Sequence, residues 1–164
     1  MKRIILVRHA KTISEGYDND FNRTLKPVGK DDALRISLKL KEKSDQPELL
    51  LSSPAVRAMQ TARIYAETFG YPATSIRQEP VFYTGLSTSK LIDHLHCFPD
   101  TVSTILLVGH NPTIHLFASE LINSFNRSFP TCTTVGIDFK ISQWIQLKVN
   151  QGELAFYLTP ATVQ

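Results

Sequence analysis

Four basic side chains could act together on one negatively charged group, because each comes shortly after a short apolar run of the chain. They are Arg8, His9, Arg57 and His110. An arginine presents a planar fork that meets phosphate oxygens two at a time. A neutral imidazole can attack phosphorus and carry the phosphoryl group as phosphohistidine. The two residue types together therefore favour phosphoryl transfer.

This chemistry sets a requirement for each group. The attacking imidazole must keep a proton on its other ring nitrogen, most simply through a hydrogen bond to a backbone carbonyl. Two guanidinium groups can neutralise the equatorial oxygens as charge spreads in a loose transition state, and a second imidazole can donate to the transferring oxygens. No metal ion or other cofactor is needed, and the sequence contains no evident metal-ligand cluster.

The elements that must position these residues alternate between strand and helix. We expect strands at 4–7, 49–52, 75–78 and 104–108, and helices at 27–43, 54–69, 89–96 and 112–125. This alternation predicts a mostly parallel sheet that is covered by helices on both faces. Ligands of such sheets bind beyond the carboxyl ends of the strands, so the four basic side chains should meet at one rim. Ser53 and Asn111 are expected to cap the helices that follow them.

The last part of the chain departs from this alternation. We expect strands at 134–141, 144–149 and 154–158, with a hairpin turn at 150–152 between the last two. The predicted fold class is therefore α/β, a three-layer α/β/α sandwich whose mostly parallel sheet has an antiparallel C-terminal strand or hairpin. Neither a linker nor a repeat interrupts the sequence, so we expect a single domain over residues 1–164.

The composition excludes several classes of protein. The chain has 164 residues, of which 42% are hydrophobic, enough for one domain with a substantial core. Its net charge of +3 is too small to indicate a nucleic-acid-binding protein. The two cysteines, Cys97 and Cys132, exclude a dense disulfide framework and a four-cysteine zinc site. The first apolar run is too short for a signal peptide and no run is long enough to span a membrane, so we expect a cytoplasmic protein.

Three segments resemble the signatures of the histidine phosphatase superfamily, and they occur in the same order. Residues 4–10 resemble its opening Arg-His-Gly signature, with Ala10 in the glycine place, and residues 51–62 and 107–112 resemble the second and third signatures. The region around Trp144 and the short length of the chain are similar to the branch that contains the SixA-type phosphohistidine phosphatases. The resemblance implies a phosphoglycerate mutase-like fold.

The resemblance also implies a role for each basic residue. His9 would be the nucleophile, and Arg8 and Arg57 would bind the phosphate of the substrate. His110 would bind the phosphate as well and would stabilise the transferring group. The substrate would be a protein that carries phosphohistidine or a small phosphorylated metabolite, and the resemblance implies neither a nucleic-acid nor a membrane partner.

A general acid is the part of the superfamily pattern that this sequence lacks at the usual place. Many members have a glutamate after the third strand, whereas residues 80–85 contain no carboxylate. Glu79 would serve only if the strand ends early, and Asp18 is a second candidate. An alkoxide leaving group needs a proton from a positioned acid, whereas an imidazole leaves far more easily. The pattern therefore favours phosphohistidine as the substrate.

Two other functions stay open at this point. A small-molecule phosphomonoesterase or mutase of the same superfamily would need a nearby carboxylate and a cap over the substrate, and the chain is short of both. A non-catalytic phosphate- or phosphopeptide-binding module would keep Arg8 and Arg57 but would need no nucleophile, so the two histidines argue against it. The resemblance also places Lys11 and Arg23 at the edge of the site.

Overall fold

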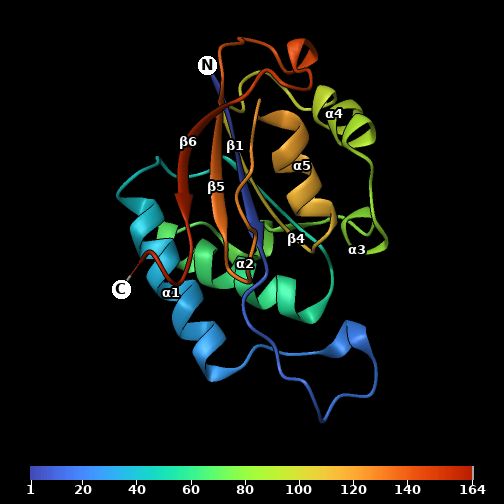
Figure 1. The fold of residues 1–164 in the computed structure, drawn as a ribbon, viewed down its shortest axis with the longest axis vertical. Coiled ribbons are helices and arrows are strands. Elements are labelled where there is room, and N and C mark those ends of the chain that lie inside the picture. Colours follow the sequence, from blue (N-terminus) through green and yellow to red (C-terminus); the bar gives the residue numbers. More distant parts are fainter. Residues whose placement is uncertain (164) are drawn as a thin grey trace.

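Six strands form one mixed sheet (Figure 1). The computed structural model describes residues 1–163, and residue 164, the last of the predicted domain, lies outside the described residues. The strands are β1 (Lys2–Arg8), β2 (Leu49–Ser52), β3 (Arg77–Gln78), β4 (Thr104–Gly109), β5 (Thr134–Phe139) and β6 (Glu153–Leu158). Their order across the sheet is β3-β2-β4-β1-β5-β6. The first four strands along the chain pair in parallel, whereas β5 runs antiparallel to β1 and β6 antiparallel to β5, as predicted.

Helices cover both faces of this sheet. They are α1 (Pro27–Lys41), α2 (Val56–Phe69), α3 (Val81–Thr84), α4 (Thr88–His96) and α5 (Thr113–Leu121), with 3-10 turns η1 (Asp20–Asn22), η2 (Ala73–Ser75) and η3 (Trp144–Gln146). Figure 1 shows α1 and α2 on one side of the sheet and α4 and α5 on the other. The predicted three-layer arrangement is confirmed. No helix within residues 1–163 combines the length and the apolar character that crossing a bilayer requires.

The central strand β1 is buried on both of its faces. Successive side chains of a strand point to opposite sides of the sheet. Ile4 and Leu6 accordingly belong to the core under α4 and α5, while Ile5 and Val7 belong to the core under α1 and α2. Burial of each such side chain contributes about 1.5–3 kcal/mol. An unbroken apolar run is therefore what this position in the sheet requires.

The segment 144–149 is not a strand, so this part of the prediction was wrong. Trp144 instead begins the turn η3, where its fully buried indole donates to the carbonyl oxygen of Val102 at 2.9 Å. Leu147, three residues later, is also buried. A three-residue spacing between buried positions matches a 3-10 turn, whereas a half-buried strand repeats every two residues.

The predicted hairpin turn at 150–152 was wrong for a related reason. Gly152 donates its backbone N–H to the carbonyl oxygen of Leu121 at 2.8 Å. A Cβ atom on this glycine would lie 2.4 Å from a methyl group of Ile137, so the close approach requires glycine. The segment therefore packs against the end of α5, and β6 pairs with β5 without an intervening strand.

Two side chains expected to cap helices have other partners. Neither Ser53 nor Asn111 caps the helix that follows it, because α2 and α5 begin further along the chain. The hydroxyl oxygen of Ser53 lies 2.7 Å from Nε2 of His110. The side-chain amide of Asn111 donates to the carbonyl oxygen of Phe129 at 3.0 Å. Both side chains therefore join segments at the end of the sheet instead of stabilising a helix end.

Candidate active site

The carboxyl ends of β1, β2 and β4 lie side by side and bring distant segments together. The backbone pairing continues one residue past the strands. The N–H of His9 donates to the carbonyl oxygen of Gly109 at 3.0 Å, and the N–H of Ser53 donates to that of Val108 at 3.0 Å. His110 follows directly, and its ring lies next to that of His9, with 5.1 Å between the ring centroids. The predicted meeting of these two histidines at one rim is present in the structure.

His9 is held with one ring nitrogen engaged and the other free. Its side chain is buried, and Nδ1 lies 2.8 Å from the carbonyl oxygen of Ala10. A carbonyl oxygen can only accept, so this bond assigns the proton to Nδ1 and leaves the lone pair on Nε2. The backbone N–H of Ala10 in turn donates to the hydroxyl of Thr61 on α2 at 3.0 Å, which fixes the segment behind the ring.

The surroundings of His9 keep its imidazole neutral. Burial lowers the pKa of His9 to about 3, against the opposing effect of the bond to Ala10. Repulsion from His110, Arg57 and Arg8 contributes to this lowered pKa. A neutral ring with a free Nε2 is the form that can attack an electrophile.

His110 is also neutral. Burial lowers its pKa to about 4, and the positive charges of Arg57 and Arg8 act in the same direction, whereas Asp20 opposes them. Its Nε2 faces the Ser53 hydroxyl, while its Nδ1 is buried without a hydrogen-bond partner.

Arg57 reaches the site from the first turn of α2. A helical side chain leans toward the N-terminus of its own helix, and here that direction is the rim of the sheet. Nη1 donates to the backbone carbonyl oxygen of Asp20 at 2.6 Å and Nη2 donates to Oδ2 of the same residue at 2.9 Å. The side chain is 7% exposed, and its Nε is buried without a partner.

Arg8 is anchored in a similar way at the end of β1. Its Nη1 donates to the carbonyl oxygen of Phe129 at 2.8 Å, and its Nε is buried without a partner. Burial lowers the pKa of Arg8. A guanidinium group nevertheless stays charged in a protein, so the site contains two fixed positive charges beside two neutral imidazoles.

Three buried nitrogen atoms that belong to residues at this rim have no hydrogen-bond partner. They are Nε of Arg8, Nε of Arg57 and Nδ1 of His110. An unpaired buried donor costs about 1–3 kcal/mol, so such a group is usually explained by a ligand or by function. A phosphoryl group has three equatorial oxygens that can accept from these donors while its phosphorus faces Nε2 of His9.

The two carboxylates considered as general acids are engaged elsewhere. β3 does end at Gln78, the condition under which Glu79 was expected to serve. However, Oε1 of Glu79 lies 2.5 Å from Nε of Arg77 and 3.5 Å from Nε2 of His94. Asp18 accepts from the side chain of Asn22 at 3.0 Å and 3.1 Å within its own loop. Within residues 1–163, neither carboxylate hydrogen-bonds to one of the two site histidines.

The loop between β1 and α1, which extends away from the sheet in Figure 1, supplies a residue that the sequence analysis missed. Asp20 binds Arg57, and its Oδ2 also accepts from the Tyr83 hydroxyl at 3.2 Å. Arg23 reinforces the loop, because its Nη2 donates to the Thr12 hydroxyl at 2.6 Å. Arg23 thus lies beside the site, as the resemblance implied, whereas the side chain of Lys11 is exposed. The signal that could have identified Asp20 was its acidic side chain three positions before Arg23, a residue that the resemblance already placed at the edge of the site.

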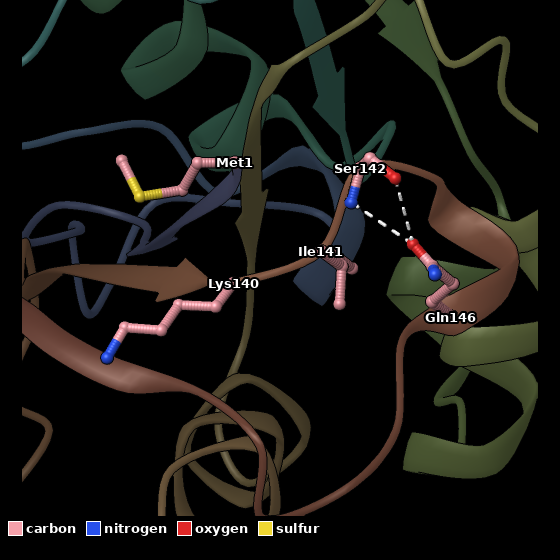
Figure 2. Close-up of a pocket in the computed structure, with 5 residues that line it drawn as sticks. All are labelled: Met1, Lys140, Ile141, Ser142 and Gln146. Atoms are coloured by element: carbon pink, nitrogen blue, oxygen red, sulfur yellow. Dashed lines mark hydrogen bonds between the residues drawn. The ribbon is translucent and has the colours of Figure 1, made fainter.

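A surface hollow elsewhere lacks comparable chemistry. It has a volume of about 450 Å³ and lies at the opposite end of the sheet, beside the start of β1. Figure 2 shows its lining residues, which are Met1, Lys140, Ile141, Ser142 and Gln146. The cation of Lys140 is paired with Glu153 at 2.7 Å. Within residues 1–163, no group of three or more His, Cys, Asp or Glu side chains is arranged to hold a metal ion.

Comparison of sequences relates the first half of the chain to a known family. Residues 4–80 match the model of the histidine phosphatase superfamily, branch 1. An uncharacterized chloroplastic protein of Arabidopsis thaliana is 30% identical over 119 residues, which cover 67% of this chain and 54% of that protein. The chain therefore spans about half the length of this curated relative.

Comparison of structures extends the similarity to nearly the whole chain. The protein histidine phosphatase SixA, solved in complex with tungstate, superposes with a TM-score of 0.84 at 20% identity, covering 99% of each chain. A SixA-type protein of Agrobacterium tumefaciens gives a TM-score of 0.79 at 26% identity, covering 97% of this chain and 98% of that one. The sheet order and the antiparallel C-terminal strands are thus those of a phosphoglycerate mutase-like fold.

Proposed function

Since the chain belongs to the histidine phosphatase superfamily, we propose that it is a phosphatase that forms a covalent phosphohistidine on His9. The observation that carries this proposal is that Arg8, Arg57 and His110 each have a buried nitrogen without a partner, while His9, on whose ring all three act, has its Nε2 free. Those donors suit the oxygens of a phosphoryl group, and the free nitrogen suits its phosphorus.

The first step forms one bond and breaks another. The lone pair on Nε2 of His9 attacks phosphorus, while the bond from phosphorus to the leaving group breaks and its electron pair goes to the leaving group. The ring gains positive charge, which the Nδ1–H bond to the carbonyl oxygen of Ala10 stabilises. Arg8, Arg57 and His110 neutralise the charge on the equatorial oxygens.

The second step uses water. A water oxygen attacks phosphorus, the bond between phosphorus and Nε2 breaks, and the electron pair returns to the ring. Both hydrogens of the water leave with the phosphate product, and the ring returns to its neutral form with the proton on Nδ1. The same donors act in both steps, so no metal ion is part of the proposed mechanism, and chelation with EDTA should leave the rate unchanged.

A protein phosphohistidine is the substrate that we propose. Glu79 is paired with Arg77 and Asp18 with Asn22, so the contacts of neither carboxylate place it as the acid that a leaving alkoxide needs. An imidazole leaves more easily than an alkoxide and depends less on such an acid. The similarity to the protein histidine phosphatase SixA supports the same substrate class.

A comparison of two substrates tests the proposal. The purified chain should dephosphorylate a histidine-phosphorylated protein at least about tenfold more efficiently, in kcat/KM, than a sugar phosphate, because only the ester needs strong acid catalysis. His9→Gln should abolish turnover of both substrates. His115→Gln, a substitution on α5, should leave kcat/KM for both substrates equal to that of the unaltered chain. A higher kcat/KM on the sugar phosphate would instead favour a small-molecule phosphatase, and phosphate binding without turnover would favour a binding module.

A further inference from the structure

We propose that Asp20 is a positioning residue that orients Arg57 toward the phosphoryl group, an inference that rests on the proposed function. Asp20 accepts two hydrogen bonds from Arg57. Its backbone carbonyl oxygen accepts from Nη1 and its carboxylate accepts from Nη2. The two residues are 37 positions apart along the chain, so the contact joins the loop after β1 to the first turn of α2.

The geometry of the guanidinium group shows why this contact does not compete with phosphate. A guanidinium has five N–H donors in one plane, arranged so that two edges can each meet a pair of oxygens. Asp20 occupies the end edge, which Nη1 and Nη2 form. The side edge, formed by Nε and the second N–H of Nη2, stays available, and Nε is buried without a partner. Asp20 therefore fixes the plane of the group and leaves the edge that suits an oxyanion.

Asp20 is itself held from two further directions. Its Oδ1 accepts from Nη1 of Arg23 at 3.3 Å, and its Oδ2 accepts from the hydroxyl of Tyr83, on α3, at 3.2 Å. The ring of Tyr83 lies edge-on to that of His110, with 5.8 Å between centroids. The position of Asp20 is therefore tied to the same wall of the site that carries His110.

The carboxylate of Asp20 accepts hydrogen bonds and does not donate a proton. Partial burial tends to raise its pKa, but the bonds from Arg57, Arg23 and Tyr83 outweigh that effect and hold the pKa below its usual range. An ionised carboxylate that receives these donors has no proton to give to a leaving group. Orientation of Arg57 is the function that its contacts support.

A double-mutant cycle tests this role. Asp20→Ala should lower kcat/KM for p-nitrophenyl phosphate by about tenfold or more, and should weaken inhibition by tungstate by a similar factor, because Arg57 loses the carboxylate bond at Nη2 and keeps only the backbone bond at Nη1. In the Arg57→Ala background the same substitution should cause no further loss. Equal losses in both backgrounds would overturn the proposal, as would a gain of activity in Asp20→Ala.

Two further variants separate positioning from disruption of the loop. Asp20→Asn keeps an oxygen acceptor and should lose less activity than Asp20→Ala. Asp18→Asn, in the same loop but bonded to Asn22, should stay within about twofold of the unaltered chain. If Asp18→Asn loses as much as Asp20→Ala, the loop matters only as a whole and the positioning role is wrong.

A comparison of rates on substrates with two different leaving groups completes the test. A positioning residue should change the rates on p-nitrophenyl phosphate and on phenyl phosphate by the same factor, since Arg57 contacts only the transferred group. A larger loss on phenyl phosphate, the poorer substrate, would identify Asp20 as a proton donor and overturn the inference. His9-dependent turnover that is insensitive to Asp20→Ala would contradict this inference alone, whereas an unaltered chain without turnover would contradict the proposed function too.

Discussion

The hydroxyl oxygen of Ser53 lies 2.7 Å from Nε2 of His110, and this contact favours one tautomer of His110 when the hydroxyl is the donor. The Ser53 oxygen already accepts from the backbone N–H of Ala55 at 3.3 Å, so its own hydrogen can point at Nε2. The proton of the neutral ring is then on Nδ1, the buried nitrogen without a partner. With this tautomer, Nδ1–H of His110 is the donor to the transferring oxygens.

Ser53→Ala should therefore change the tautomer of His110. Loss of the hydroxyl removes the donor to Nε2, so the proton is shared between both ring nitrogens. We expect kcat to fall by about tenfold, the size of one lost hydrogen bond. Nitrogen-15 shifts of the His110 ring should change from the Nδ1–H form toward a mixture. Ser52→Ala, which removes a hydroxyl bonded to the Ser53 carbonyl, is the control and should keep the Nδ1–H signal.

Arg57→Ala should remove a large part of the transition-state stabilisation. Loss of one such donor costs about 2.7–4 kcal/mol, or roughly 10²–10³ in kcat. Arg57→Lys should recover little, because an ammonium group cannot present the two N–H donors of a guanidinium edge. Arg63→Ala, which removes an exposed arginine on the same helix, should retain full activity. A loss below about tenfold in Arg57→Ala would show that its side edge does not bind the substrate.

Both site histidines should titrate only in acid. The pKa of His9 is lowered to about 3 and that of His110 to about 4. In ring-carbon NMR titrations from pH 8 to pH 4, the signal of His9 should therefore stay that of a neutral ring. Arg57→Ala should move both titrations to higher pH, because a repelling positive charge is removed. A midpoint near pH 6.5 for His9 would contradict the burial that the structure shows.

The same shifts make stability depend on pH with a definite sign. In the unfolded chain these histidines have pKa values of about 6.5, so the unfolded state binds more protons than the folded state at any pH between that value and about 4. Their contribution to stability is therefore complete above pH 6.5 and is lost progressively as the pH falls toward 4. The melting temperature should decrease less over this range in a chain carrying both His9→Gln and His110→Gln.

The sequence predicted the parts of the site that follow from strand topology. Arg8 ends a strand that is buried on both faces, and His9 and His110 directly follow such strands, which are visible as unbroken apolar runs. The rule that ligands bind beyond the carboxyl ends of parallel strands then placed these residues on one rim.

The contacts that hold the side chains of the site in place join segments far apart in the sequence, so no local sequence pattern indicated them. Ser53 precedes a proline and a helix, the usual context of a cap. Its hydroxyl instead faces His110, which follows the neighbouring strand β4. Asp20 meets Arg57 only because the loop after β1 returns to α2. The segment from Trp144 was mistaken for a strand, since a short apolar run does not distinguish a strand from a tight turn.

Trapping of the covalent intermediate tests the central claim most directly. The purified chain is mixed with a phosphoryl donor, quenched in alkali and digested, and the peptides are examined by mass spectrometry. We predict one phosphoryl group on the peptide that contains His9, stable in alkali and lost in acid, and none in His9→Gln. A phosphoryl group on another residue, or turnover that persists in His9→Gln, would contradict the account.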